Sequence, residues 1–482
     1  MRVLEGLKPE RVFYYFEELT RIPHGSGNTD AISKYCMEVA NGLGLEHWRD
    51  EFNNVTIIKP ATPGYENAPA VIIQGHLDMV NEKTADSDHD FDKDPLKLRV
   101  IGDWIWATDT TLGGDDGIAI AYALAILEDN TLEHPRLECL FTTDEEVGME
   151  GAVGYDASRL NGKYLLNMDS EEEGIFLTSC AGGIRYHLQL PIRRIETEGN
   201  VVTLTLSGLM GGHSGVEIDK GRGNADILLG YVLNRLAEKY TYGLISVDGG
   251  FKDNAIPREA SARLMIDVIE FEALSASVAE LESALRSDFA GIEEDIVLTL
   301  SQPEEKQIGF MHPEDQQKVL FLLMQAPNGV QAMSMNIPGL VETSLNLGIL
   351  KTTETEVSLA FALRSSVEHR RDALGAKLAC LITYLGGTYD TTGAYPAWEY
   401  RRDSKLRELM LDTYRDVYGK EPEIQAIHAG LECGLFGKKI SGLDMISFGP
   451  DMKDIHTPQE CLCISSVQRV WEYVVEVLRR MK

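Results

Sequence analysis

The chain has 482 residues, of which 44% are hydrophobic and 25% charged, a globular composition that excludes a disordered or collagen-like protein. Its formal net charge of −31 argues against binding to nucleic acid or to an anionic membrane surface, because both are themselves negatively charged. The length predicts about two to four folding units.

The first residues lack the apolar core of a signal peptide, and no window reaches the roughly 18 apolar residues of a membrane span. We therefore expect a cytoplasmic protein. The seven cysteines are scattered and form no CxxC pair, which is unlike a disulfide framework or a thiolate metal site.

Both ends of the chain alternate apolar runs of strand length with helical segments, which predicts an α/β fold with a mostly parallel central sheet flanked by helices. The predicted strands are 70–74, 137–142, 164–168 and 445–448. The predicted helices are 9–20, 30–41, 117–128, 405–418 and 465–481.

The middle of the chain has an α+β pattern that occurs twice, which predicts an inserted domain of two similar halves. We expect strands at 201–207, 262–269, 296–300, 342–350 and 356–363, and helices at 224–238, 273–287, 315–324 and 371–385. The predicted insertion is 183–397, and the outer domain is formed by 1–182 and 398–482.

Metal-binding side chains follow all four predicted strands of the outer domain. They are His76 after the first strand, Glu145-Glu146 after the second, Asp169 after the third and His456 after the fourth. The carboxyl ends of parallel strands lie at one edge of a sheet, so these side chains can converge. Asp115 precedes a predicted helix and can join them from its loop.

Two histidines and three carboxylates without cysteine suit a pair of zinc ions, with cobalt or manganese as substitutes. The predicted ligands are His76, Asp115, Glu146, Asp169 and His456. Two neighbouring dications repel each other unless an anionic group lies between them, and Asp115 is the candidate bridge. Asp78 follows His76 by two residues and is expected to orient it without binding metal.

The Glu145-Glu146 pair predicts two different roles for its two carboxylates. Adjacent side chains on an extended backbone point in opposite directions, so one carboxylate can bind metal while the other removes a proton from water. We expect Glu145 to be the general base and Glu146 the ligand.

In this combination and order, the motifs closely resemble the two-zinc peptidases that include carboxypeptidase G, aminoacylase, peptidase T and the carnosinases. By this resemblance, His76 and Asp169 hold one zinc, Glu146 and His456 hold the other, and Asp115 bridges them. Many relatives have a lysine after the second acid, where this chain has Asp115-Asp116-Gly117. Asp116 is therefore the alternative bridging residue. We favour Asp115 because the first acid of the pair is the bridging residue in the family.

The resemblance also implies roles for the inserted domain. His213, in Gly-Gly-His-Ser-Gly, matches the family histidine that donates a hydrogen bond to the oxyanion. Asn254 matches a residue of the substrate site, and Gly430 matches a glycine whose main chain meets the substrate. Arg364 ends a predicted strand and can bind the free α-carboxylate of a substrate.

The function implied by the resemblance is metal-dependent hydrolysis of dipeptides, including those with a C-terminal histidine, by a homodimer that pairs through the inserted lid domain. An N-acyl-amino-acid deacylase of the same family is the alternative. A two-metal phosphohydrolase is disfavoured by the acidic chain, and a peptide-binding protein without activity is disfavoured by the presence of Glu145.

Overall fold

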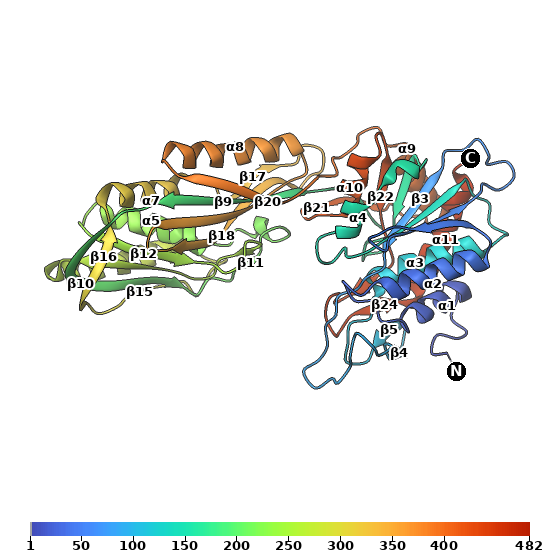
Figure 1. Cartoon of the computed structure of the whole chain (residues 1–482), viewed down its shortest axis with the longest axis horizontal. Helices are drawn as coiled ribbons and strands as arrows, with labels where there is room; N and C mark the ends of the chain where they lie inside the picture. Colours follow the sequence, from blue (N-terminus) through green and yellow to red (C-terminus); the bar gives the residue numbers. More distant parts are fainter. Residues whose placement is uncertain (1) are drawn as a thin grey trace. The chain divides into compact units, whose positions relative to one another are not determined.

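The computed structural model describes residues 2–482. The chain folds into two compact units (Figure 1). The first unit comprises the N-terminal part through Ser179, Tyr400–Ala426 and Leu431–Lys482, and the second comprises Cys180–Glu399 and Ile427–Gly430. The segment Ile427–Gly430, which we expected in the outer domain, is thus grouped with the second unit. Its backbone explains this, because Ala181 N donates to the carbonyl oxygens of Ile427 and Ala429 at 3.1 and 3.0 Å.

The first unit contains an eight-stranded sheet in the order β1-β2-β6-β3-β7-β22-β8-β21. The central strands β6, β3, β7 and β22 are parallel, whereas β1, β2 and β8 pair antiparallel with their neighbours. The predicted α/β class and the parallel centre of the sheet are therefore confirmed. The strands are β1 Glu46–Arg49, β2 Val55–Lys59, β3 Val71–His76, β6 Leu137–Thr142, β7 Tyr164–Asn167, β8 Ile175–Cys180, β21 Glu423–Ile427 and β22 Asp444–Ser447.

Seven helices and a small antiparallel sheet complete the first unit among the described residues. The helices are α1 Glu10–Leu19, α2 Asp30–Gly42, α3 Gly114–Glu128, α4 Glu150–Gly154, α9 Lys405–Tyr418, α10 Glu432–Lys439 and α11 Ile464–Arg480, with a short 3-10 helix at Ala157–Arg159. The small sheet, which we did not predict, consists of β4 Leu98–Ile101, β5 Trp104–Ala107, β23 Met452–Lys453 and β24 Cys461–Cys463.

Helix α3 forms the centre of the first hydrophobic core. Every residue from Ile118 to Leu127 is at most 2% exposed, and the helix contacts both α1 and β3. A helix that is apolar on all sides has to be buried. The N-terminus of α3, which carries Asp115, is consequently held in the interior beside the end of β3.

The second unit contains a ten-stranded sheet in which two halves repeat one topology. In each half the elements follow a β-α-β-β-α-β order and give a four-stranded arrangement, β15-β10-β14-β12 in one and β20-β9-β19-β18 in the other. In the second half, β9 is separated in the chain from the other elements by the whole of the first half. The strands are β9 Gly182–Pro191, β10 Arg194–Ser207, β12 Gly243–Gly249, β14 Ala260–Ile266, β15 Val297–Leu300, β16 Glu304–Met311, β17 Gly329–Met333, β18 Val341–Thr352, β19 Glu356–Ser365 and β20 Thr388–Tyr395. Strands β11 Gly212–His213 and β13 Ala255–Ile256 form a separate pair.

Four helices pack on this sheet, namely α5 Ala225–Ala237, α6 Phe271–Asp288, α7 Pro313–Gln325 and α8 Glu368–Tyr384. In Figure 1, α8 runs along β9 and β20, which it contacts. Strand β14 alternates buried and partly exposed residues, as expected of a sheet with one face covered by helices.

The predicted strand 262–269 was too long. It ends at Ile266, because the side chain of Asp267 accepts a hydrogen bond from Ile269 N and starts the 3-10 helix Val268–Glu270. A further 3-10 helix lies at Ile218–Lys220. None of the helices within residues 2–482 combines the length and apolar character that a bilayer crossing requires.

Candidate metal centre

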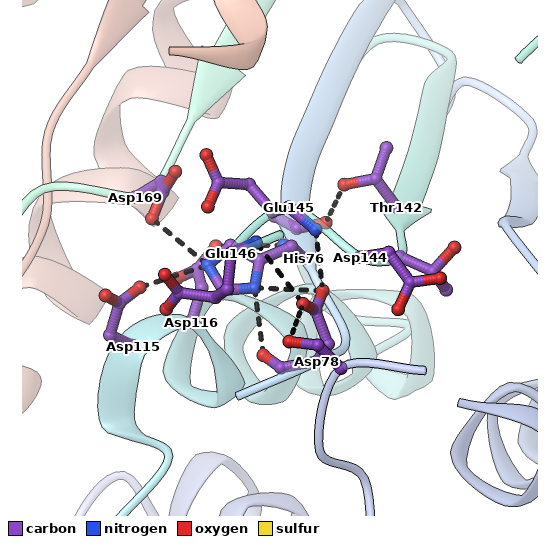
Figure 2. Close-up of polar contacts among 12 residues, drawn as sticks. His76, Asp78, Asp115, Asp116, Thr142, Asp144, Glu145, Glu146 and Asp169 are labelled. Atoms are coloured by element: carbon purple, nitrogen blue, oxygen red, sulfur yellow. Dashed lines mark hydrogen bonds and ion pairs between the residues drawn. The ribbon is translucent and has the colours of Figure 1, made fainter. Parts of the chain in front are cut away.

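His76 is the last residue of β3 and is 1% exposed. Its Nδ1 lies 2.9 Å from the carbonyl oxygen of Asp78, and the Asp78 Oδ1 atom is 3.5 Å from the same nitrogen. A ring that donates from Nδ1 keeps Nε2 free as a metal ligand. Figure 2 shows the Asp78 and His76 side chains in contact, the arrangement expected for a residue that orients the imidazole.

The carboxylate of Asp115 lies between two histidines. Its Oδ1 is 3.1 Å from His76 Nε2, and its Oδ2 is 3.2 Å from His456 Nε2. Asp115 adopts this position because the first residues of α3 are not helical, with φ −83° and ψ 107° at Asp115 itself. Each of its two oxygens therefore faces a different histidine.

Each histidine has a second carboxylate beside it. Asp169 Oδ1 is 3.7 Å from His76 Nε2, and Glu146 Oε1 is 2.8 Å from His456 Nε2. Figure 2 shows Asp169 and Asp115 directed at His76, from the end of β7 and the start of α3. All five predicted ligands thus lie in one cluster. Asp115, Glu146 and His456 form one group of possible ligands and His76 and Asp169 form another with Asp116, while the 3.1 Å contact between Asp115 and His76 links the two groups.

These separations fit a zinc site. Bonds of roughly 2.0–2.1 Å in a tetrahedron place neighbouring ligand atoms about 3.3 Å apart. The histidine-to-carboxylate distances here range from 2.8 to 3.7 Å. The donor set of imidazole nitrogens and carboxylate oxygens, without a thiolate, suits zinc and similar divalent ions.

Asp116 faces inward, toward the backbone of β3. Its Oδ2 accepts a hydrogen bond from His76 N at 3.1 Å, and the side chain is fully buried. A Cβ at Gly75 would lie 2.4 Å from this oxygen, so only glycine leaves room for it. Burial raises the pKa of Asp116 well above its ordinary value, with the charge of Asp115 adding to the shift.

The Glu145-Glu146 pair lies in a turn, with Gly148 N and Met149 N both donating to the Glu145 carbonyl oxygen. Our premise of an extended backbone at this pair was wrong. Both carboxylates nevertheless have an oxygen within 4.8 Å of a His76 ring nitrogen.

Asp78 holds this turn through hydrogen bonds to its backbone. Its carboxylate accepts hydrogen bonds from Glu145 N at 3.1 Å and Glu146 N at 3.4 Å, and also from Ser26 Oγ at 2.8 Å. The neighbouring Asp144 points away from the cluster in Figure 2 and accepts from Gly27 N at 2.6 Å. Asp78 therefore connects the position of His76 to that of the two glutamates.

The crowding of buried acids makes several of them hard to ionise in the metal-free protein. Burial raises the pKa of Glu145 to about 8 and that of Asp169 well above its ordinary value, and neighbouring carboxylates add to both shifts. Hydrogen bonds that the His456 ring donates to Asp115 and Glu146 raise the pKa of His456 to about 10. Such a group of acids is stabilised either by protons or by bound cations.

We therefore expect the metal-free protein to lose stability as the pH rises from about 5 to 8. Burial gives Glu145 and Glu432 folded-state pKa values of about 8 and about 7, above the ordinary 4.5 of an unfolded chain. The folded state binds more protons in this window, and raising the pH removes them at a cost in stability.

Thermal melting in the presence of a chelator at pH 5.5 and pH 8 measures this effect. Added zinc should raise the melting temperature more at pH 8 than at pH 5.5, because metal ligands must be deprotonated. A melting temperature of the chelated protein that increases with pH would contradict the prediction.

His213 lies in the second unit on β11, where its ring orientation is well defined. Its Nδ1 is 3.2 Å from the backbone N of both Gly215 and Val216, which can only donate. A neutral ring that accepts at Nδ1 carries its proton on Nε2. Burial lowers the pKa of His213, with the charge of Arg364 adding to the shift, so the neutral form dominates.

Arg364 and His428 lie near His213 in the same unit. Arg364 donates to Tyr395 Oη at 3.0 Å, while its buried Nε has no hydrogen-bond partner in the protein. His428 Nε2 is 2.7 Å from Ser344 Oγ, and burial together with the charge of Arg364 lowers the pKa of His428 to about 3. An incompletely paired guanidinium among neutral histidines can bind an anionic group.

The other two predicted substrate residues also lie in the second unit. The carbonyl oxygen of Asn254 accepts from Ser214 N at 2.9 Å, next to His213, and the Asn254 side chain is exposed. Gly430 is partly exposed, two residues after His428. Their contact with substrate stays a prediction.

Sequence reasoning assigned no role to two buried polar residues, one in each unit. Glu432 is buried and accepts hydrogen bonds from Gln74 at 2.5 Å and Thr142 at 2.6 Å. His428 was part of a quoted motif but received no role. A buried acid at the start of α10 has no distinctive sequence pattern, and only its neighbours in space identify it.

Comparison with known proteins gives a consistent result. A model of peptidase family M20/M25/M40 matches residues 72–480. The Cytosol non-specific dipeptidase of Escherichia coli (strain K12) is 38% identical over 483 residues, covering 100% of this chain and 99% of that protein. The crystal structure of aminoacylhistidine dipeptidase from Vibrio alginolyticus is 39% identical with a TM-score of 0.93, covering 98% of this chain and 97% of that one.

A more distant structure, the aminopeptidase PepT from Bacillus cereus, has 15% identity and a TM-score of 0.57, covering 98% of this chain and 99% of that chain, and is similar in fold alone. The match to the family confirms the resemblance seen in the motifs and implies that the chain uses a divalent metal. The chain belongs to peptidase family M20/M25/M40 and is a peptide-bond hydrolase.

Proposed function

We propose that this protein is a metallodipeptidase of broad specificity that hydrolyses unblocked dipeptides, including those ending in histidine. The observation that carries the proposal is the position of Asp115, whose two oxygens lie 3.1 and 3.2 Å from the Nε2 atoms of His76 and His456. The names of the Escherichia coli and Vibrio alginolyticus relatives support the substrate class.

The proposed cofactor is a pair of zinc ions, for which cobalt or manganese could substitute. His76 and Asp169 would hold one ion, Glu146 and His456 the other, and Asp115 both. When bound, the ions would lower the pKa of a water molecule and polarise the scissile carbonyl. Asp115 is favoured over Asp116 as the bridge because its two oxygens face the two histidines, whereas one Asp116 oxygen accepts from His76 N and the Asp116 group of possible ligands does not include His456.

Glu145 is the proposed general base. It would take a proton from the attacking water and return it to the leaving amine, so that no covalent intermediate with the protein forms. Burial is the main cause that raises the pKa of Glu145 to about 8 in the metal-free chain. Nearby cations would lower this pKa toward 7, because they stabilise the charged carboxylate. Asp78 supports Glu145 indirectly, because its carboxylate accepts a hydrogen bond from the backbone N–H of Glu145.

His213 is the proposed oxyanion donor. Because its Nδ1 accepts two backbone N–H groups, its Nε2–H is the free donor of the ring. A neutral donor of fixed orientation stabilises charge as it develops on the substrate carbonyl oxygen.

Arg364 is the proposed partner of the substrate α-carboxylate. Replacing it with methionine should raise the KM for dipeptides about 10- to 100-fold with a smaller change in kcat, because a hydrogen bond to a charged group contributes about 1.5–3 kcal/mol. The exposed Arg370, which pairs with Glu342, is the control for loss of an arginine in the same unit. An unchanged KM in Arg364→Met would remove this role.

Elemental analysis of the purified protein combined with a substrate panel tests the function. We expect two zinc equivalents per chain and turnover of unblocked dipeptides in preference to N-acylated amino acids. Preference for acylated amino acids would favour the deacylase alternative. Turnover of a generic phosphate ester without peptide hydrolysis would overturn the proposal.

We further propose a cytoplasmic location and a homodimer formed through the second unit. The location is supported by the name of the Escherichia coli relative, which is a cytosol dipeptidase. Light scattering coupled to size exclusion tests the dimer, because a mass of one chain at micromolar concentration would exclude it.

A further inference from the structure

Glu460 binds the loop that carries Asp115 through four consecutive backbone N–H groups. Its Oε2 accepts from Leu112 N at 2.7 Å and Gly113 N at 3.2 Å, and its Oε1 accepts from Gly114 N at 2.7 Å and Asp115 N at 3.4 Å. The Glu460 side chain is buried, with the residue 3% exposed. All four hydrogen-bond partners are donors, so both oxygens act only as acceptors.

This loop depends on an acceptor from elsewhere in the chain. The first N–H groups of a helix have no partner within the helix, and α3 has no side-chain cap of its own. Leu112, Gly113 and Gly114 are buried, so water cannot take the place of the missing acceptor. Glu460 supplies acceptors for all of these groups at once.

The contact is also closely packed. A Cβ at Gly114 would lie 3.2 Å from Glu460 Oε1 and 3.2 Å from Met452 Sδ. Gly113 has φ of +68°, a backbone conformation that favours glycine. The two glycines before Asp115 therefore allow the backbone to approach the carboxylate.

Glu460 links two sides of the metal centre. It follows His456 by four residues, and its backbone N donates to Thr457 O at 3.0 Å, which closes the turn between them. One short segment therefore carries His456 and also holds the backbone of Asp115, whose Oδ2 lies 3.2 Å from His456 Nε2. A carboxylate shared by two ions needs a defined position for both of its oxygens.

We propose that Glu460 is a positioning residue that fixes the Asp115 loop and thereby sets the affinity and geometry of metal binding. This inference rests on the function proposed above. Groups that orient metal ligands typically change metal affinity by about 10- to 100-fold when they are replaced. A purely structural glutamate would change the stability of the protein and leave the affinity of the folded protein for metal unchanged.

The test compares Glu460→Gln with Glu17→Gln. Glu17 is a matched control, because it is 4% exposed and accepts backbone N–H groups from Val3 at 3.0 Å and Leu4 at 2.9 Å, away from the ligands. A glutamine at position 460 has one oxygen, and its NH₂ group would face two backbone donors. Zinc affinity of the metal-free proteins is measured by competition with a chromophoric chelator, and coordination by the visible spectrum with cobalt.

We expect Glu460→Gln to bind at least one ion about 10- to 100-fold more weakly than the wild type, with an altered cobalt spectrum. Glu17→Gln should bind zinc within roughly twofold of the wild type. A folded Glu460→Gln variant with wild-type affinity and spectrum would overturn the inference while leaving the proposed function intact. A wild-type protein that binds no divalent metal would overturn both.

Melting of the metal-free variants shows whether they fold. If Glu460→Gln does not fold, Glu460→Asp takes its place, since it keeps both oxygens on a side chain one methylene shorter. Weaker zinc binding by folded Glu460→Asp supports the inference, and unchanged binding overturns it.

Discussion

Replacing Glu145 with glutamine should reduce kcat for dipeptide hydrolysis by a factor of about 10² to 10⁴ while leaving the metal content unchanged. General base catalysis contributes on this scale, and glutamine cannot take up the proton of the attacking water. The substitution preserves the shape of the side chain and the backbone hydrogen bond from Glu145 N to Asp78. Steady-state kinetics and elemental analysis of the same preparation give both quantities.

Glu150→Gln is the matched control for this experiment. Glu150 is exposed on α4, five residues along the same chain segment, and its loss should leave kcat unchanged. Turnover of Glu145→Gln within tenfold of the wild type would contradict its assignment as base. Loss of one metal equivalent from this variant would instead assign Glu145 as a ligand.

Replacing His213 with alanine should reduce kcat by a factor of about 10² to 10³, again with both metal equivalents retained. Alanine removes the Nε2–H donor and also the acceptor for Gly215 N and Val216 N. Because the oxyanion develops only as the water attacks, the loss should fall on kcat rather than on KM. Kinetics over a range of dipeptide concentrations separates the two parameters.

Two further variants make this test specific. His213→Gln retains an N–H donor and should recover part of the lost turnover. His369→Ala removes an exposed histidine of the same unit and should have no effect. A His213→Ala variant with wild-type kcat would exclude the oxyanion role.

The sequence was most informative where buried apolar runs led directly into polar residues. Strand β3 is buried throughout and ends at His76, and β6 ends at Thr142, two residues before the acidic turn. A strand with both faces covered has to be apolar, so its end is visible in the sequence. Helix α3 was predicted from 117, which is where its regular dihedral angles begin after the non-helical Asp115 and Asp116.

Exposed strands of the second unit were missed for the converse reason. Seven of the eight residues of β20 are exposed and the strand contains glycine and several threonines, so no apolar alternation marks it. Strand β16 begins with four exposed polar residues, Glu304 to Gln307, and pairs with the long β10. Such edge strands are determined by backbone pairing, which leaves little trace in the choice of side chains.

Asp78 was predicted as a supporting acid of the metal centre, whereas Glu432 and Glu460 were beyond sequence reasoning. Glu460 acts on backbone N–H groups that lie about 345 positions earlier in the chain, and a backbone N–H leaves no trace of its partner in the side chains around it. The turn at Glu145 was misjudged because a short acidic run has no hydrophobic period from which its conformation can be derived.

The centre of the first unit's sheet is completed by a strand that comes after the whole second unit, apart from residues 427–430, in the chain. Strand β22, Asp444–Ser447, lies between β7 and β8, which are made some 265 residues earlier. At about 5–20 residues per second, a ribosome would leave the edges of β7 and β8 open for roughly 15 to 50 s. The second unit can fold during this delay, while β7 and β8 still lack the partner that lies between them, and unpaired strand edges of this kind promote aggregation.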